Sequence, residues 1–528
     1  MKKINRLSIQ LFAAASLTTL LACGGGGGGD GSVAIGTSQP TWTAGVFADE
    51  SSFKNLCQSP RAGTSDRQGT TLHENHWLRS WSNNTYLWYD EITDRDPALS
   101  STALEYFALL KTEATTPSGN PKDQFHFTYD TEEWEQLQQS GVSAGYGAKW
   151  KIVSSAPPRE IRVAYNEPNS PAASANLDRG AEILEIDGVD VVNAGDQASV
   201  NTINAGLFPA GAGETHTFTV RDIGSTQTRS ISMTSAAVTS SPVRMVNTID
   251  TPTGKVGYIL FNSHIAPAEE GLVNAVNQLS NEGVNDLVLD LRYNGGGLLA
   301  IASQLAYMIA GPTPTSGRTF DNLTFNDKHT TTNPVTGQAL SPTPFYDRSL
   351  GFSVTEGQQL PFLNLNRVFI LSTDNTCSAS EAIINGLRGV DFEVILIGST
   401  TCGKPYGFYP TDNCGTTYFT IQFRGENQKG FGDYADGFSP ANTSGTIGEV
   451  VTGCSVADDF SNPLGDAQEG QIAAALSYRT TGTCPTATGK SVSQFAEKSN
   501  NQDGSLFDSE IYRKRTLLTE NRILTNSQ

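Results

Sequence analysis

The sequence predicts an α/β protein with a second, β-rich module, and two patterns in the chain support this. In the larger part, short apolar runs expected to form strands alternate with segments of helical spacing, which is typical of an α/β domain. Before that part, short apolar runs alternate with glycine and proline, which indicates a small β-rich module. The expected strands are 256–261, 287–291, 368–371 and 394–397, and the expected helices are 267–279, 298–309 and 379–387.

The chain has 528 residues, too many for one ordinary hydrophobic core, so two or three domains are expected. Aromatic residues at helical spacing indicate a small helical domain near the start, with the aromatic side chains in its core. The polar, Pro- and Thr-rich segment 312–366 is expected to run over the surface. The expected parts are a linker at 23–54, a helical N-terminal domain at 55–138, the β-rich module at 139–238, the α/β domain at 241–480 and a polar tail at 485–528.

The charge balance restricts the kinds of partner. The formal net charge is −19, and no basic stripe is visible along the chain. This balance argues against a nucleic-acid partner, because a nucleic-acid-binding surface needs clustered Lys and Arg. Hydrophobic residues make up 37% of the chain, which is enough for globular folding.

The first residues read as a targeting segment. A basic start precedes an apolar stretch at 7–21, which is short for a permanent membrane span. The stretch ends in Leu-Ala-Cys at 21–23 and resembles a bacterial lipobox, which implies a signal peptide at 1–22 and a lipid anchor on Cys23. Residues 24–29 are all glycine and would form a tether. We therefore expect a lipid-anchored cell-envelope protein that faces the periplasm, with Gly24 favouring the outer membrane. The alternative is an ordinary secretory signal with a chance cysteine.

Six cysteines remain after Cys23, and an even number in an exported chain permits disulfides. Six cysteines allow 15 pairings, so the sequence does not fix the connectivity. Cys402 and Cys414 are close enough to close a local loop. A bridge at Cys377 would stiffen the segment that follows it, and a buried free thiol is the alternative there. The six are Cys57, Cys377, Cys402, Cys414, Cys454 and Cys484.

The β-rich module contains a helix–strand–turn succession. A short helix is expected after Ser170-Pro171, because Ser is a good cap and Pro fits the first turn. A strand at 180–186 then enters a tight turn at Asp187-Gly188. This succession resembles a PDZ domain of the bacterial protease type, and PDZ domains bind extended peptides by strand addition. The resemblance implies substrate binding at the loop Gly145, Tyr146, Gly147 and Ala148. The alternative is a module used only for packing.

Three segments of the α/β part carry the candidate chemistry. Thr-Cys-Ser-Ala-Ser-Glu at 376–381 follows an apolar strand and opens a helix, so the Ser378 hydroxyl could project beside free helix N–H groups that stabilise an oxyanion. Taken alone, it would equally be a plain helix cap. At 290–297, Asp-Leu-Arg-Tyr-Asn runs into three glycines, which let the backbone approach a reacting atom. At 403–404, Gly-Lys follows a strand, and a lysine in a dry pocket has a lowered pKa and can accept a proton.

Together, in this order, the three segments resemble the C-terminal processing (tail-specific) peptidase family over residues 140–480. The resemblance implies a crotonase-like α/β protease core paired with a PDZ domain. It implies that Ser378 is the nucleophile and that Lys404 is the general base. It also implies an oxyanion hole made by the N–H groups of Ala379 and Gly297, with Gly296 as the alternative donor. Glu381 is expected to hold local backbone, and no cofactor or metal is implied.

The chain departs from the family pattern at one position. Family members often have a glutamine four residues after the lysine, and Phe408 stands there. Gln422 is a candidate substitute for orienting Lys404, and His264 is the rival base. Gly-Val-Ser-Ala-Gly at 141–145 matches a nucleophile-elbow motif but lacks the strand before it and the helix after it, so we interpret it as a chance match. The His-Glu-Asn-His segment at 73–76 lacks zinc-helix spacing.

The leading hypothesis is a serine endopeptidase that captures unfolded or C-terminal polypeptide segments of exported proteins and cleaves them through the Ser378–Lys404 dyad. The alternative from another class is a non-catalytic envelope lipoprotein on the same fold that binds peptides or ligands. Retention of both Ser378 and Lys404 speaks against that alternative. A third hypothesis is hydrolysis of a non-peptide ester or amide by the same dyad.

Overall fold

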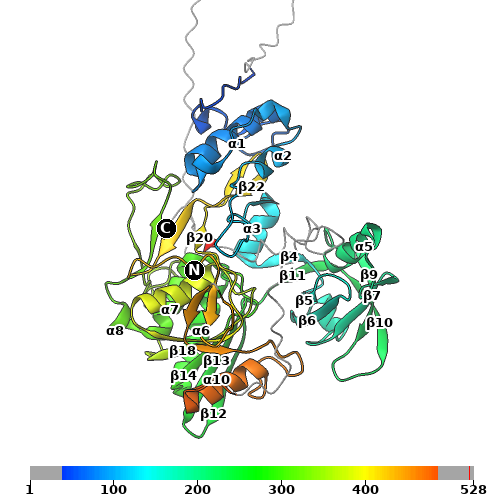
Figure 1. Ribbon diagram of the computed structural model, residues 1–528, viewed down its shortest axis with the longest axis vertical. Helices are drawn as coiled ribbons and strands as arrows, with labels where there is room; N and C mark the ends of the chain where they lie inside the picture. Colours follow the sequence, from blue (N-terminus) through cyan, green and yellow to red (C-terminus); the bar gives the residue numbers. More distant parts are fainter. Residues whose placement is uncertain (1–38, 447, 486–521, 524–528) are drawn as a thin grey trace, which may run out of the picture. The chain divides into compact units, whose positions relative to one another are not determined.

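The structure is a computed structural model that describes residues 39–446, 448–485 and 522–523. The predicted signal peptide and Cys23 lie outside the described residues. The main sheet has six strands in the order β12-β13-β14-β18-β19-β26 (Figure 1). The pair β12–β13 is antiparallel, and the other neighbours are parallel. The strands are β12 (Val243–Thr251), β13 (Gly254–Phe261), β14 (Asp286–Asp290), β18 (Arg367–Ser372), β19 (Glu393–Gly398) and β26 (Gly453–Ser455).

Helices pack on both faces of this sheet. Alternate strand residues point to opposite faces: Ile259 and Leu289 share a core with the first three helices, whereas Tyr258 and Val288 share another core with the last helix. Both faces of the parallel strands are therefore buried, which explains their continuous apolar runs. The helices are α6 (Ala268–Glu282), α7 (Leu299–Ala310), α9 (Ala379–Gly389) and α10 (Gly470–Thr481).

The strands and helices expected in the α/β part are confirmed to within a few residues. Gly283 adopts φ 71° at the end of α6, and Gly311 adopts φ 75° at the end of α7. Both values lie in the left-handed region that glycine tolerates, so the two glycines end these helices. The α/β fold class predicted from the sequence is correct.

The segment after α7 differs from the expected surface excursion. It contains α8 (Pro312–Thr315), β16 (Thr319–Thr324) and β17 (Thr343–Pro344). Its side chains Phe320, Phe325, Phe345 and Leu360 are buried in the main core. The expectation of a path over the surface was wrong for these residues and for Leu365, because the polar composition of the segment obscured its few apolar anchors.

The β-rich module has its own sheet, in the order β10-β9-β7-β6-β5, with β8 paired to β7. Its core is a separate buried cluster that includes Ile161, Ile183 and Phe218. The Ser170 hydroxyl caps the expected short helix, and Asp187 and Gly188 form the expected turn with φ 50° and 78°. The elements are β5 (Ala148–Ser154), β6 (Glu160–Asn166), α4 (Pro171–Ser174), β7 (Glu182–Ile186), β8 (Val189–Asp190), α5 (Gln197–Leu207), β9 (Thr215–Arg221) and β10 (Thr228–Thr234).

Two short strands lie at the ends of this module. β4 (Val142–Gly145) and β11 (Ala236–Thr239) pair in antiparallel fashion. Ser143 therefore sits on a strand, and a loop and another strand follow it rather than a helix. The nucleophile-elbow match at 141–145 is thus a coincidence of sequence, as expected.

The segment before the β-rich module is largely helical, and its aromatic residues are core, as expected. Trp77, Trp81 and Phe107 are buried around Tyr418, which comes from a later strand. The segment has 3₁₀-helices η1 (Glu50–Ser52), η2 (Tyr89–Glu91) and η3 (Pro97–Leu99), α-helices α1 (Thr71–Thr85), α2 (Ala103–Ala108) and α3 (Thr131–Ser140), and strands β1 (Leu56–Cys57), β2 (Arg67–Gln68) and β3 (Phe127–Asp130).

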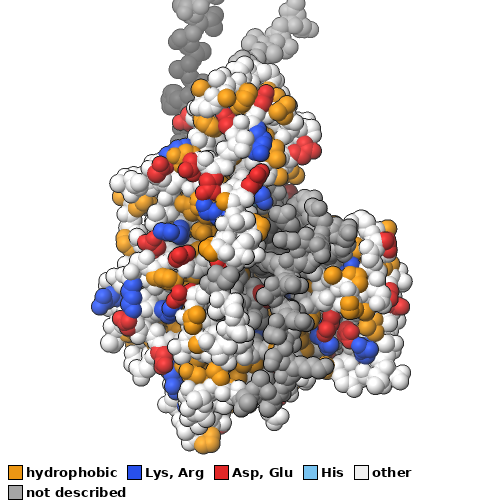
Figure 2. All heavy atoms as spheres, viewed as in Figure 1, with side chains coloured by type: hydrophobic (Ala, Val, Ile, Leu, Met, Phe, Trp, Pro, Cys, Tyr) orange, Lys and Arg blue, Asp and Glu red, His pale blue; other side chains and the backbone are white. Residues whose placement is uncertain are grey.

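The remaining strands follow the main-sheet elements of the second half of the chain. Among them, β22 pairs with β3 of the early segment, so the early segment and the α/β part share a sheet. These strands are β20 (Tyr406–Gly407), β21 (Thr411–Asn413), β22 (Thr416–Phe419), β23 (Phe423–Glu426), β24 (Phe438–Pro440), β25 (Glu449–Val451) and β27 (Arg522–Ile523). No helix among the described residues is long and apolar enough to cross a bilayer. On the face drawn in Figure 2, acidic and basic side chains are interspersed.

Candidate active site

Ser378 lies on the turn between β18 and α9, immediately before the helix. Its backbone has φ 61° and ψ −111°, a conformation that costs free energy for a residue with a Cβ. The side chain is fully buried, and its Oγ has no hydrogen-bond partner in the described chain. A strained serine at a strand-to-helix turn is typical of a nucleophile held for attack.

Lys404 lies on the loop that follows β19, and its side chain is fully buried. Its Nζ lies 4.4 Å from the ring centroid of Phe125 and 4.7 Å from that of Phe408. The position at which family members often have glutamine is therefore occupied by an aromatic ring against the lysine.

The Glu381 carboxylate joins the loops that carry Ser378 and Lys404. Its Oε2 accepts the backbone N–H groups of Ser378 and of Lys404, each at 2.8 Å. Its Oε1 accepts the Gly403 N–H at 2.9 Å and the Thr401 hydroxyl at 2.5 Å. The backbone nitrogens of Ser378 and Lys404 thus lie no further apart than twice 2.8 Å. Burial raises the pKa of Glu381, and these hydrogen bonds oppose the rise. As expected, Glu381 binds local backbone. It connects the loop that carries Ser378 to the loop that carries Lys404.

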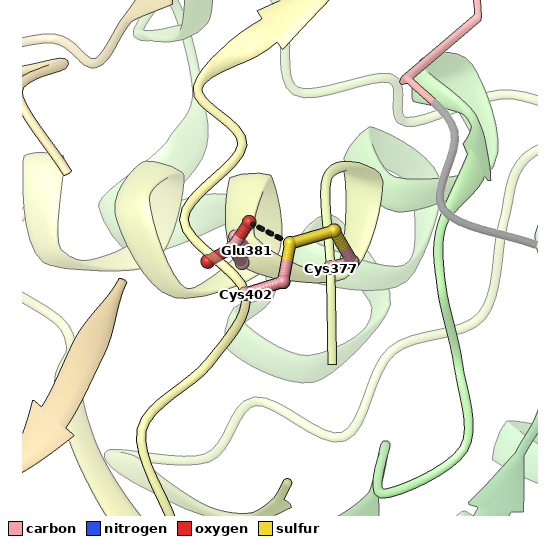
Figure 3. A group of neighbouring side chains, drawn as sticks. All are labelled: Cys377, Glu381 and Cys402. Atoms are coloured by element: carbon pink, nitrogen blue, oxygen red, sulfur yellow. Dashed lines mark hydrogen bonds between the residues drawn. A yellow bond between two sulfur atoms is a disulfide. The ribbon is translucent and has the colours of Figure 1, made fainter. Parts of the chain in front are cut away.

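A disulfide makes the same connection covalently. Cys377 and Cys402 are bonded, with their Cα atoms 5.2 Å apart. Figure 3 shows the bridge beside Glu381, whose Oε2 lies 3.4 Å from the Cys402 sulfur. The ligand atoms of these three residues lie within 4.8 Å of one another. Sulfur atoms bonded to each other are not the thiolates that a metal site requires, so the cluster is structural.

The other cysteines form the bridges Cys57–Cys414 and Cys454–Cys484. A bridge between Cys402 and Cys414, which would have closed a local loop, therefore does not form. Both residues instead bond to cysteines that the tertiary fold brings near.

We expect loss of the Cys377–Cys402 bridge to lower activity selectively. The double substitution Cys377→Ser with Cys402→Ser should reduce kcat/KM by about 10²-fold, because ~1 Å of misplacement in a reacting group has that effect. Stability should fall by about 3 kcal/mol, as for other loops of this size. Turnover of an unstructured protein and urea unfolding measure the two effects.

The Cys454–Cys484 bridge is a matched control. It closes a loop of 30 residues against 25 for Cys377–Cys402, so its removal should cost similar stability while activity per folded molecule stays near the parent value. Equal loss of activity in both double variants would contradict a role for Cys377–Cys402 in positioning the site.

The glycine turn after β14 lies against the segment that contains His264. The Gly296 carbonyl accepts the His264 N–H at 3.0 Å, and the Leu298 N–H donates to the His264 carbonyl at 2.8 Å. Gly297 has φ 133°, and a Cβ there would lie 2.5 Å from the His264 carbonyl oxygen. Only glycine fits this position, which explains the sequence at this turn.

Of the predicted oxyanion donors, the geometry favours Ala379 and Gly297. The Gly296 N–H already donates to Asn294 Oδ1 at 2.9 Å. Ala379 is the first residue of α9, where an N–H has no acceptor within the helix. Successive strand residues direct their N–H groups to opposite edges, so Gly297 faces away from the edge that His264 occupies.

Asn294 fixes the glycine turn against the nucleophile turn, a role that sequence reasoning missed. Its carbonyl accepts the Cys377 N–H at 3.2 Å and the Ser380 hydroxyl at 3.0 Å. Its side-chain amide donates to the Phe261 carbonyl at 2.9 Å. The only sequence signal for this role was the position of Asn294 directly before three glycines.

His264, the rival base, is fully buried, and its Nδ1 lies 3.0 Å from Asn294 Oδ1. Burial lowers the pKa of His264 to about 3, against an opposing effect of the hydrogen bond to Asn294. An imidazole with this pKa is a weak base, so His264 is a poor candidate for the general base.

His264 should make stability depend on pH in a defined window. In the unfolded chain its pKa is about 6.5, so between pH 3 and about 6.5 the unfolded state binds more protons than the folded state. The free energy of unfolding should therefore rise with pH across this window. Urea midpoints from pH 4 to 7 should show a smaller rise for His264→Gln than for the parent. Equal slopes would contradict the buried neutral imidazole.

Gln422, the candidate substitute for the missing glutamine, is buried beside the lysine loop. Its Oε1 accepts the Tyr409 N–H at 2.7 Å, and its Nε2 has no partner in the described chain. Gln422 therefore fixes the backbone just after Phe408.

The loop 145–148 connects β4 to β5 at the start of the β-rich module. The Tyr146 carbonyl accepts the Ala172 N–H at 2.9 Å, and the Gly147 carbonyl accepts the Glu167 N–H at 2.7 Å. Gly147 has φ 73° and leaves no room for a side chain, because a Cβ would lie 2.4 Å from Ser170. The loop thus has a fixed shape against α4.

The segment that carries these features, residues 255–408, matches the model of peptidase family S41. The chain carries a peptidase S41 domain. Both Ser378 and Lys404 fall inside the match, and the predicted resemblance to C-terminal processing peptidases is confirmed.

Among curated relatives of the chain, a carboxyl-terminal-processing protease of Picosynechococcus sp. is 30% identical over 172 residues, covering 32% of this chain and 39% of the relative. The chloroplastic carboxyl-terminal-processing peptidase 3 of Arabidopsis thaliana is 23% identical over 243 residues, covering 44% of this chain and 41% of the relative. Each alignment spans about two fifths of the relative's length.

A solved structure supports the fold of the chain. A crystal structure of a Bacteroides fragilis protein that bears the name of an S41 protease superposes with a TM-score of 0.58. The superposition covers 77% of this chain and 97% of the other, at 23% sequence identity. At this identity the likeness concerns the fold alone.

Proposed function

We propose that the S41 domain is a serine endopeptidase in which Ser378 attacks the peptide carbonyl and Lys404 accepts the hydroxyl proton. The observation that carries this proposal is the frame that joins the two residues: the Cys377–Cys402 bridge and the Glu381 Oε2 that accepts both backbone N–H groups. A serine that served only as a helix cap would not require these connections to the loop of a buried lysine.

The chemistry follows from the positions of these groups. The Lys404 side chain is fully buried, and in this proposal its neutral amine accepts the proton of the serine hydroxyl. Attack by Ser378 Oγ forms a tetrahedral intermediate, whose oxyanion the N–H groups of Ala379 and Gly297 stabilise. Lys404 passes the proton to the leaving amine, and water then hydrolyses the acyl-enzyme.

The β-rich module supplies the proposed substrate capture. β5 is the last strand of its sheet, so one backbone edge is available for an extended peptide. The loop 145–148 leads directly into β5. From β5, the Lys151 Nζ reaches Asp374 on the segment before the nucleophile at 2.5 Å. A PDZ-like peptide site on β5 would thus adjoin the catalytic turn.

We expect Gly147→Ala to weaken substrate capture. The added Cβ collides with Ser170 and displaces the loop, so KM for an unstructured protein should rise about 10-fold while kcat for a short peptide stays near the parent value. Gly188→Ala is the matched control, because Gly188 has φ 78° in the same module with open space around it. Equal KM values for the two variants would contradict capture at this loop.

The export and lipid anchor belong to the same proposal, with Cys23 as the lipidated residue at the bacterial outer membrane, facing the periplasm. The three disulfides support an oxidising compartment. Labelled fatty acid should be incorporated into the parent and not into Cys23→Ser, and incorporation into both would contradict the anchor.

The proposed activity is tested by incubating the purified protein with an unstructured protein and following the fragments. The parent should cleave it, and Ser378→Ala should not, although it remains folded. A non-catalytic peptide-binding lipoprotein is the second candidate, favoured by the unpartnered Ser378 Oγ. Binding without cleavage by the parent, with and without an added C-terminal peptide, would establish that alternative. Faster turnover of simple esters than of any peptide would instead indicate a non-peptide substrate.

A further inference from the structure

One of the disulfides lies directly beside the proposed catalytic residues. Cys377 immediately precedes Ser378, and Cys402 lies two residues before Lys404. The bridge therefore joins the loop of the proposed nucleophile to the loop of the proposed base by a covalent bond, beside Glu381 (Figure 3). A reaction that opens or closes this bond acts on the relative positions of the two catalytic side chains.

The two cysteines of this bridge differ in exposure. Cys377 is fully buried, whereas Cys402 is partly exposed. Thiol–disulfide exchange begins with attack of a thiolate on one of the two sulfur atoms, so an outside thiolate reaches Cys402 and expels Cys377. Cys377 lies at the N-terminus of α9, where the helix dipole stabilises the negative charge of a leaving thiolate. The arrangement thus favours attack from one side.

Hydrogen bonds also hold the two loops near each other. The Cys402 N–H donates to the Thr376 carbonyl at 3.1 Å, and the Cys377 N–H donates to the Asn294 carbonyl at 3.2 Å. Glu381 accepts backbone N–H groups from both loops. None of these bonds involves sulfur, so they stay available when the bridge is reduced. We therefore expect reduction to loosen the two loops without unfolding the domain, and the bridge can form again.

We propose that the Cys377–Cys402 bridge is a thiol-sensitive switch, which keeps the enzyme active when oxidised and inactivates it when reduced. This inference rests on the proposed peptidase function. Reduction replaces a covalent bond by a contact between two thiols, so the loops are no longer fixed to each other. Because about 1 Å of misplacement in a reacting group lowers the rate about 10²-fold, a small displacement is enough.

The reductant is a dithiol. One of its thiolates attacks the Cys402 sulfur, forms a mixed disulfide and expels Cys377 as a thiolate. The second thiolate attacks the sulfur of the reductant in the mixed disulfide, which closes the oxidised dithiol and releases the Cys402 thiolate. The bridge gains two electrons and two protons, and the dithiol loses two electrons and two protons. An external disulfide drives the reverse exchange.

The test treats the oxidised full chain with increasing dithiothreitol under native conditions and follows cleavage of an unstructured protein that lacks cysteine. Free thiols are alkylated at each step and located by peptide mapping. We expect kcat/KM to fall about 10²-fold as Cys377 and Cys402 become alkylated. Circular dichroism should show a folded reduced protein, and oxidised glutathione should restore activity in a sample that was not alkylated.

Two double variants assign the effect to one bridge. Cys454→Ser with Cys484→Ser should have parent-like activity and should still be inhibited by the dithiol. Cys377→Ser with Cys402→Ser should have low activity from the start, and the dithiol should not lower it further. If the dithiol inhibits this second variant as strongly as the parent, another group is responsible and the proposed switch is overturned.

The thiol map separates this inference from the peptidase proposal. A Cys377–Cys402 bridge that opens without a change in cleavage would overturn the switch and leave the peptidase intact. A bridge that resists a dithiol concentration sufficient to reduce the urea-unfolded protein would do the same, as would faster cleavage after reduction. If the oxidised protein cleaves nothing, the peptidase proposal fails, and the switch is overturned with it even where the map shows that the bridge opens.

Discussion

Replacement of Lys404 by methionine is expected to lower kcat/KM for an unstructured protein by about 10²–10⁴-fold, the usual contribution of a general base. Methionine keeps the unbranched apolar stem that packs against Phe125 and Phe408, so the fold should be retained. The loss should appear in kcat rather than in KM, because the amine acts on the serine proton and the substrate is held elsewhere. Steady-state kinetics of the purified variant measure both constants.

Lys255→Met is the control for this substitution, because Lys255 is exposed on β13. It should have parent-like kinetics, and both variants should unfold at parent-like urea concentrations. If the Lys404 variant keeps more than about a tenth of the parent kcat, a base other than Lys404 takes the proton, and His264→Gln becomes the informative variant.

Replacement of Arg292 by methionine is expected to lower the free energy of unfolding by about 3–5 kcal/mol, because removing one partner leaves buried charge uncompensated. Arg292 has no exposed surface and donates to Asp290 at 2.6 Å, Asp458 at 2.8 Å and Glu469 at 2.7 Å. Burial alone would raise the pKa of Asp458, but the charges of Arg292 and Arg179 hold it below its usual value. Without Arg292, the buried Asp290 and Glu469 carboxylates lose their guanidinium partner, and Asp458 keeps its ion pair with Arg179.

The unfolding midpoint in urea measures this effect, and Lys429→Met is its control. Lys429 pairs with Asp391 at the surface, where the side chains are 51% and 83% exposed, and exposed pairs contribute about 0–1 kcal/mol. A loss below 1 kcal/mol for Arg292→Met would show that the fold neutralises the three carboxylates without the arginine.

The α/β elements could be predicted because their causes are local. The runs at 287–291 and 394–397 are apolar on both faces of a parallel sheet, and Gly283 and Gly311 end helices through left-handed backbone. The surface path expected for 312–366 failed because a few apolar anchors such as Phe320 cannot be separated by composition from the polar residues around them.

The candidate site was predictable in part. The order of three short segments indicated Ser378, Lys404 and the glycine turn, but the frame that joins them depends on tertiary contacts. Glu381 lies 23 residues from Lys404, and no local pattern shows that its carboxylate reaches that N–H. The six cysteines allow 15 pairings, and only the fold selects Cys377–Cys402.

Long-range partners were beyond sequence reasoning for the same reason. Asp458 and Glu469 lie 166 and 177 residues from Arg292, and each is an ordinary acidic residue in its own segment. Arg522 and Ile523 of β27 lie in a tail that its composition describes only as polar, and they pair with β15 (Gly297–Leu298).

The most direct test of the central claim is covalent labelling of the parent and of Lys404→Met with a serine-reactive fluorophosphonate, followed by peptide mapping. We expect the parent to carry the adduct on Ser378 and the Lys404 variant to react at least about 10²-fold more slowly, since the probe reports the nucleophile without requiring a natural substrate. An unmodified Ser378 in active parent protein, or equal labelling rates in the two proteins, would contradict a serine nucleophile activated by Lys404.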